Sequence, residues 1–278
     1  MGDGIMVSTS SFIMMGITCF VCFIVPLVLI WWLRKRYQAS ITSFLTGMIA
    51  FVVAVQVIEA PINYYFLVVN GNTSSWLTQP VIYSLYGGLM AGIFEETARY
   101  LCFRFCLKKQ TRLQDSLSYG VGHGGIEAML IVGTTYISNI VISLFINHGL
   151  IENLGFSTAL EQSITEQLTM VSPIIFGVAG YERLMTLIIQ IGLSVLVFKA
   201  VRERKIKYYL FAILLHASLD LPAALYQLGK VNLIATEGLV TLFAIGFLVF
   251  IFRQIKRYKE DLSIPEDQEL QKYQKAGY

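Results

Sequence analysis

Ionisable side chains lie inside stretches of the sequence that are otherwise long and apolar. A charged group in the hydrocarbon of a bilayer costs at least ~2–3 kcal/mol, so each one needs a functional or structural reason. These residues are therefore the candidate site. Four stretches contain them: Glu95, Glu96 and Arg99 in 81–107, His123 and Glu127 in 116–146, Glu182 and Arg183 in 172–200, and His216 and Asp220 in 208–228.

The spacing of these residues predicts that several of them share a helix face. Residues four positions apart lie one above the other on a helix, and three stretches each hold such a pair. Counted from the nearest basic cluster at ~1.5 Å per residue, the pairs lie at similar depths of roughly 13–20 Å. Three polar faces can therefore meet in one buried, hydrated pocket. The pairs are Glu95 with Arg99, His123 with Glu127, and His216 with Asp220.

Carboxylates, imidazoles and a guanidinium at one site supply the parts of acid–base hydrolysis. A carboxylate can take a proton from water, and the cationic groups can stabilise an oxyanion. No serine or cysteine nucleophile stands out, and the His-Glu-x-x-His pattern of helix-borne zinc sites is absent. Zinc could still be held by His123, His216 and a carboxylate on separate helices. The metal-free interpretation is favoured, and no cofactor is expected.

A purely structural role is the alternative for some of these charges. Arg99 can neutralise Glu95 or Glu96 without taking part in any chemistry. Glu182 and Arg183 are adjacent, so their side chains point about 100° apart on a helix and should not easily pair with each other. Glu182 is therefore expected to reach inward to a partner such as Arg99.

The composition places these residues in a bilayer. Hydrophobic residues make up 55% of the 278 positions and charged residues 14%, about half of what soluble domains carry. The apolar blocks are long enough to cross a ~30 Å hydrocarbon layer as helices. We predict an all-α polytopic membrane protein with about seven transmembrane helices. The predicted spans are 12–33, 41–68, 81–107, 116–146, 172–200, 208–228 and 231–252.

Basic residues set the predicted topology. They cluster after the first, third, fifth and seventh spans, which are alternate connections and the C-terminal tail. By the positive-inside rule, the N-terminus lies outside and the C-terminus in the cytoplasm, and the first span is a retained anchor. Topology thus accounts for the basic residues, and the net charge of +3 gives no reason to expect a nucleic-acid partner.

The spans have no linker or internal repeat that would divide them. Residues 1–259 are expected to form a single transmembrane domain, followed by a charged cytoplasmic tail at 260–278. Within the long outer connection, apolar residues at helical spacing over 158–170 fit either a short helix or a plain loop. Apart from the chance-like spacing of Cys19 and Cys22, the four cysteines form no Cys-x-x-Cys pair of zinc or redox type, and they indicate no disulfide framework.

Three short motifs resemble those of known intramembrane proteases. They match, in order and in placement on separate spans, the motifs of the CPBP group, which includes the type II CAAX prenyl endopeptidases. Within that group the chain is most similar to the YhfC-like membrane peptidases, akin to the PrsW proteases, from about the second span to the seventh. The three segments that resemble the CPBP motifs are Glu95-Glu96-Thr97-Ala98-Arg99, Tyr119-Gly120-Val121-Gly122-His123 and His216-Ala217-Ser218-Leu219-Asp220. The similarity to the YhfC-like peptidases rests on the continuation of the second segment to Ala128, on Tyr181-Glu182-Arg183, and on the continuation of the third segment to Pro222.

The resemblance implies a glutamate-dependent peptidase. Glu95, with His123, would activate a water that attacks a peptide carbonyl, and His216 and Asp220 would stabilise the oxyanion. The remaining residues would orient and charge-balance this base or support the site from outside it: Glu96, Arg99, Glu127 and Glu182.

Two departures from the prenyl endopeptidase pattern limit what it implies. Those enzymes place the arginine one residue further from the glutamate pair and carry Asn where Asp220 stands. An ionised Asp220 would repel an oxyanion, so it must be protonated or must fix His216 instead. Prenylated substrates are therefore not implied.

The expected partners are a membrane protein or peptide substrate and the lipid bilayer, in a bacterial plasma membrane. Two other classes stay open. Buried acids and histidines also relay protons in transporters, although the pseudo-symmetric halves of a transporter are not visible in the sequence. In a non-enzymatic membrane scaffold, the acidic pair would be dispensable.

Overall fold

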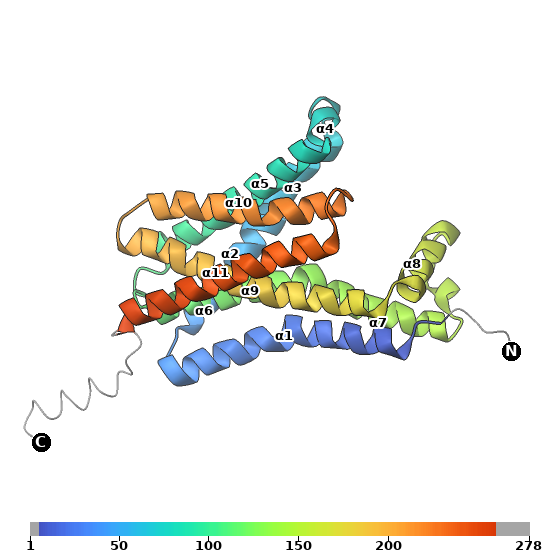
Figure 1. Cartoon of the computed structure of the whole chain (residues 1–278), viewed down its shortest axis with the longest axis horizontal. Coiled ribbons are helices and arrows are strands. Elements are labelled where there is room, and N and C mark those ends of the chain that lie inside the picture. Colours follow the sequence, from blue (N-terminus) through green and yellow to red (C-terminus); the bar gives the residue numbers. More distant parts are fainter. Residues whose placement is uncertain (1–5, 260–278) are drawn as a thin grey trace, which may run out of the picture. The chain divides into compact units, whose positions relative to one another are not determined.

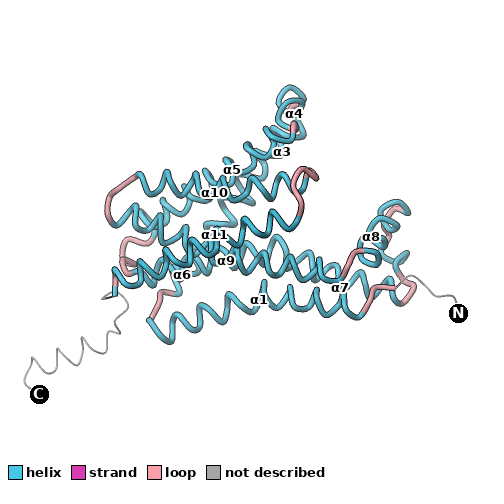
Figure 2. The backbone as a smooth tube through the Cα atoms, in the orientation of Figure 1, coloured by secondary structure: helices cyan, strands magenta, loops and turns pink. Residues whose placement is uncertain are grey.

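The computed structural model describes residues 6–259, so the predicted tail at 260–278 lies outside the described residues. Within the described range every regular element is a helix and none is a strand (Figure 2). This confirms the predicted all-α class. The α-helices are α1 (Thr9–Tyr37), α2 (Ile41–Phe51), α3 (Ala60–Tyr64), α4 (Gly71–Leu77), α5 (Pro80–Leu101), α6 (Leu113–Ala128), α7 (Thr134–Asn147), α8 (Thr158–Met170), α9 (Pro173–Arg202), α10 (Lys207–Gln227) and α11 (Leu233–Arg257).

Six helical stretches in the described part of the chain are long and apolar enough to cross a bilayer. They correspond to six of the seven predicted spans: Thr9–Tyr37, Ile41–Val69, Leu113–Asn147, Pro173–Arg202, Lys207–Gln227 and Leu233–Arg257. The remaining predicted span is α5, in which Glu95, Glu96 and Arg99 lower the hydropathy. A polytopic membrane protein is thus confirmed, while the number of spans and their topology stay predictions.

Short π-helical segments interrupt several of the long helices. They are η1 (Val52–Glu59), η2 (Tyr65–Val69), η3 (Cys102–Cys106) and η4 (Met129–Gly133), whereas η5 (Ile151–Leu154) is a 3₁₀ turn. A π turn contains one residue more than an α turn, so it rotates the side chains that follow it onto a different face. Such turns are frequent at functional sites, and η1 ends at Glu59.

The chain divides into two compact units, made of residues 1–27 with 127–184 and residues 28–126 with 185–278. In the first unit an apolar core includes Met15, Leu168 and Phe176. The Thr18 hydroxyl donates to the Phe176 carbonyl at 2.6 Å. The segment 158–170 is the helix α8, with the Ser157 hydroxyl capping its first turn, which decides between the two predicted alternatives.

Close backbone contact fixes the helices of the second unit. A Cβ on Gly88 would lie 2.6 Å from the Ala217 carbonyl oxygen, and one on Gly92 would lie 2.8 Å from that of Ile213. Helices α5 and α10 therefore pack closely at these glycines, and Figure 1 shows the two helices next to each other. Gly122 of α6 meets the Phe44 carbonyl of α2 in the same way.

Glu203, just beyond α9, connects the ends of two helices in the second unit. Its carboxylate accepts from Lys205 at 3.1 Å and from the Tyr258 hydroxyl at 3.0 Å, and lies 3.3 Å from Arg257. Although desolvation raises the pKa of Glu203, these hydrogen bonds and the Lys199 charge hold the pKa below its ordinary value. Its negative charge thus helps to join α9 and α11.

Candidate functional site

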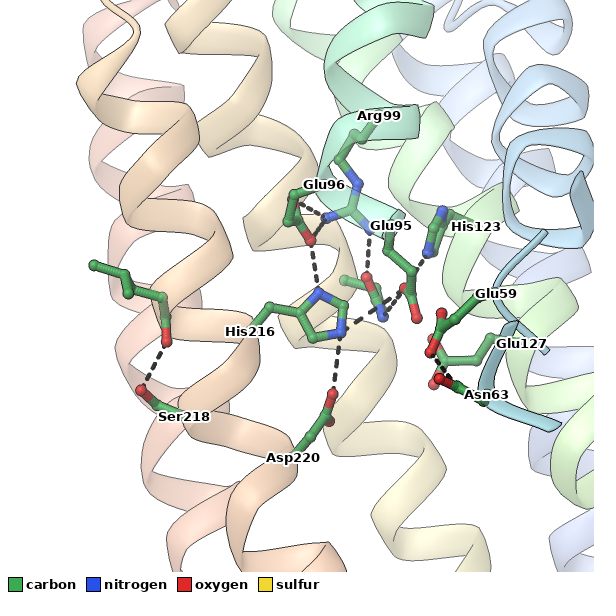
Figure 3. Close-up of polar contacts among 12 residues, drawn as sticks. Glu59, Asn63, Glu95, Glu96, Arg99, His123, Glu127, His216, Ser218 and Asp220 are labelled. Carbon is green, nitrogen blue, oxygen red and sulfur yellow. Dashed lines mark hydrogen bonds and ion pairs between the residues drawn. The ribbon is translucent and has the colours of Figure 1, made fainter. Parts of the chain in front are cut away.

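Carboxylates and imidazoles from three helices meet in the second unit. Glu95 and Glu96 come from α5, His123 from α6 and His216 from α10, and all four side chains are buried. His123 Nε2 lies 2.8 Å from Glu95 Oε2, and His216 Nδ1 lies 2.7 Å from Glu96 Oε1 (Figure 3). His216 Nε2 is 3.8 Å from Glu95 Oε2. The polar faces of these helices therefore converge on one cluster.

Arg99 holds the glutamate pair in a defined arrangement. Its Nη1 donates to both oxygens of Glu96, at 2.8 and 2.9 Å, while Nη2 donates to Gln190 Oε1 at 2.5 Å. Gln190 in turn donates through Nε2 to Glu95 Oε2 at 3.3 Å. Arg99 therefore pairs directly with Glu96 and reaches Glu95 only through an amide. Both ends of the Arg99–Glu96 pair are fully buried, so each charge depends on the other.

The contacts of His216 fix which ring nitrogen carries a proton. Glu96 is ion-paired with Arg99, and an ionised carboxylate only accepts hydrogen bonds, so His216 Nδ1 is the donor in their contact. Its Nε2 faces Asp220 Oδ2 at 3.5 Å, one helical turn along α10. Asp220 thus faces the imidazole, which is the arrangement expected of a residue that orients His216.

His123 is buried against aromatic rings. The Phe51 ring meets it edge-on at 5.3 Å between centroids, and the Tyr119 ring stacks at 6.1 Å. Its Nε2 contacts Glu95, but the buried Nδ1 has no hydrogen-bond partner among the described residues. The ring is thus held firmly and retains a nitrogen with unused bonding capacity.

The first unit places Glu182 differently from the prediction. Arg183 Nη2 forms a very short ion pair with Glu182, and Nη1 donates to Glu127 at 3.1 Å. The expectation that Glu182 and Arg183 should not easily pair is therefore wrong, because the long Arg183 side chain bends back across the angle between them. Arg183 bridges two carboxylates and neutralises part of their charge.

Glu127 lies near the end of α6, where the first unit resumes along the chain. It follows His123 by one turn of α6, so the two side chains share a face of that helix. Within the second unit, Glu95 and His123 offer a carboxylate oxygen and an imidazole nitrogen that lie 2.8 Å apart. Carboxylate oxygen and imidazole nitrogen are ligands that divalent zinc accepts.

Two residues of the cluster were missed by sequence reasoning. Gln190 is neutral, so it gave no signal as a buried charge. Glu59 did give one, because it is the single carboxylate within the predicted span 41–68, and its side chain is only 6% exposed. Asn63 donates to Glu59 Oε1 at 3.1 Å.

The charges of the cluster fit a cation. The cluster in the second unit contains four carboxylates, those of Glu59, Glu95, Glu96 and Asp220, and the guanidinium of Arg99 (Figure 3). With all four carboxylates ionised, His216 protonated on both nitrogens and His123 neutral, two negative charges stay uncompensated, which is a costly arrangement in a low dielectric. The mixed carboxylate and imidazole donors, the excess negative charge and the unpartnered nitrogen of His123 all suit a divalent metal.

The fold and the cluster define a polytopic membrane protein with a buried, hydrolase-like set of acids and histidines. A family profile described as "YhfC intramembrane metalloprotease" matches residues 21–243. An "Uncharacterized membrane protein YhfC" of Bacillus subtilis (strain 168) is 37% identical over 255 residues, which cover 91% of this chain and 99% of the relative. The chain therefore belongs to the YhfC family. No solved structure matches it.

The comparisons confirm some expectations and overturn one. They confirm the similarity to the YhfC peptidases and an integral protein of a bacterial plasma membrane, and they support peptide-bond hydrolysis within the membrane. The expectation that no cofactor is needed is wrong, because the family is described as metalloproteases, which implies a metal ion. The missing His-Glu-x-x-His pattern misled the prediction, since ligands on separate helices leave no such local pattern.

Proposed function

We propose that this protein is a metal-dependent intramembrane protease that hydrolyses a peptide bond of a membrane-associated protein or peptide. The observation that carries the proposal is the meeting of Glu95, His123 and His216 from α5, α6 and α10 in one buried cluster. Membrane helices rarely bury so many ionisable groups without using them. The relation of this family to the CPBP and PrsW proteases stays a prediction.

Glu95 and His123 of the second unit are the proposed metal ligands. Their ligand atoms lie 2.8 Å apart, and Gln190 donates to Glu95 from outside the pair. Such an outer hydrogen bond fixes the orientation of a ligating carboxylate. When bound, a divalent ion such as zinc supplies Lewis acidity that polarises a carbonyl and lowers the pKa of water.

The other residues orient charge around this group. Arg99 compensates Glu96, and Glu96 in turn fixes the His216 ring through Nδ1. This leaves His216 Nε2 directed at the space beside Glu95, where an imidazolium that carries a proton on both nitrogens can donate to the developing oxyanion of a peptide carbonyl. Asp220 acts through His216 as a positioning residue, and a direct role as oxyanion donor is not required of it.

The proposal is tested with protein purified in detergent and fluorogenic peptides that contain an apolar segment. Cleavage should stop after treatment with a zinc chelator and return when Zn²⁺ is added. Glu95→Gln should lower kcat/KM by about 100-fold or more, since it removes both charge and a ligand. Glu166→Gln, which alters an exposed carboxylate on α8, is the matched control and should cleave normally.

A transporter or a scaffold predicts the opposite results. If cleavage persists in protein shown to be free of metal, the metal-dependent mechanism is wrong. Full activity of the folded Glu95→Gln variant would exclude the assigned cluster as the active site.

A further inference from the structure

Glu59 is a buried carboxylate that the proposed ligand group does not use. It ends the π-helical segment η1 inside the stretch Ile41–Val69, and it is 6% exposed. Its Oε2 is fully buried and has no hydrogen-bond partner among the described residues. An unpaired carboxylate oxygen in the apolar interior is costly, so its retention requires a reason.

A chain of hydrogen bonds orients this carboxylate. The Tyr86 hydroxyl of α5 donates to Asn63 Oδ1 at 2.8 Å, which turns the Asn63 amide so that Nδ2 donates to Glu59 Oε1 at 3.1 Å. Every donor in the chain points towards Glu59, so Glu59 is the terminal acceptor. A carboxyl group that is held at one oxygen and open at the other has the arrangement of a metal ligand.

The open oxygen belongs to the candidate site. Among the charged groups around Glu59, Glu95 has the largest electrostatic effect on it, followed by His216 and Asp220. Figure 3 shows its carboxylate beside that of Glu95, with Asn63 next to it on the same segment. A carboxylate placed only to stabilise helix packing would not be expected next to other carboxylates, because like charges repel at short range.

We propose that Glu59 supplies a further carboxylate ligand to the divalent metal of this site, and that Asn63 and Tyr86 hold it in position. The inference rests on the proposed metal-dependent function. It assigns the second predicted span a direct part in the site, alongside α5, α6 and α10. A cation next to Glu59 would satisfy Oε2 and offset the repulsion between Glu59 and Glu95.

The test measures Zn²⁺ affinity and not only activity. Wild type and variants are purified in detergent, stripped with a chelator, and titrated with Zn²⁺ against a chromophoric competitor. Glu59→Gln keeps the size of the side chain and its bond to Asn63 but removes the charge, so it should raise the Kd at least ~10-fold. Asn63→Ala should raise the Kd by a smaller factor. Glu166→Gln should bind as wild type does.

The possible outcomes separate this inference from the function on which it rests. If wild type itself binds no Zn²⁺, the proposed metalloprotease is wrong. If wild type binds and Glu59→Gln binds equally well, only the ligand role of Glu59 is refuted, even when that variant loses cleavage. Should Glu59→Gln fail to fold, Glu59→Asp replaces it, because it retains the charge but withdraws the carboxylate by one methylene. A Kd for Glu59→Asp equal to that of wild type would then overturn the inference.

Discussion

Replacing Arg99 by methionine should strongly destabilise the second unit. Arg99 is 0% exposed and is the only guanidinium that contacts Glu96 among the described residues. Methionine fills a similar volume, so the main change is electrical: Glu96 keeps a buried negative charge with only His216 beside it. Removing one partner of a buried ion pair costs about 3–5 kcal/mol.

That cost converts into a measurable shift of the melting temperature. At roughly 2–3 °C per kcal/mol for a protein of this size, Arg99→Met should lower Tm by roughly 6–15 °C. The assay is thermal unfolding of the purified protein in detergent, followed by intrinsic fluorescence. Arg104→Met is the control, because Arg104 is exposed and its side chain makes only surface contacts, a hydrogen bond to the Tyr100 hydroxyl at 3.3 Å and a position over the Phe105 ring. Its Tm should change by about 2 °C or less.

A double variant shows whether charge is the cause. Glu96→Gln with Arg99→Met removes both charges, so it should be more stable than Arg99→Met alone. If the single variant melts within about 2 °C of wild type, the account of the Arg99–Glu96 pair as mutually dependent charges is wrong. A double variant less stable than the single one would point to lost packing.

Two further predictions concern packing and pH. Gly92→Ala should lower the free energy of unfolding by about 1–3 kcal/mol, because the new Cβ would lie 2.8 Å from the Ile213 carbonyl oxygen. Gly87→Ala is the control: its Cβ would meet nothing within 4 Å, so this variant should keep the wild-type stability. Equal Tm values for the two variants would contradict the close contact of α5 and α10. The lowered pKa of Glu203 predicts stability that is present above its ordinary pKa and is lost as pH falls through the folded-state pKa. The Tm difference between wild type and Glu203→Gln should therefore shrink from pH 7 towards pH 3, and a constant difference would refute the linkage.

Much of the fold could be predicted because hydrocarbon imposes simple rules. Apolar length alone located six of the long helices, and helical spacing at 158–170 gave α8 as one of two alternatives. The spacing of four residues also brought the right faces together around Glu95, His123 and His216, since backbone geometry places such residues one above the other.

The remainder depended on features that spacing does not contain. The π turn before Glu59 changes the face on which that residue lies, and a pattern of 3.6 residues per turn does not register it. Gln190 lies far along the chain from Arg99, and only tertiary structure joins them. The short Glu182–Arg183 pair depends on how a long side chain folds back, which the angle between adjacent residues does not determine.

The wide turns of η1 determine the helix face on which Glu59 lies. Glu59 reaches the cluster only because the segment Val52–Glu59 contains that extra backbone, which an α-helix of the same span would not have. If the same residues wound as a regular α-helix, the side chains that follow the extra residue would be rotated by about 100°, which would carry the carboxylate away from the cluster. Relatives that conserve the reaction should thus tolerate changes of apolar side chain here far better than insertions or deletions.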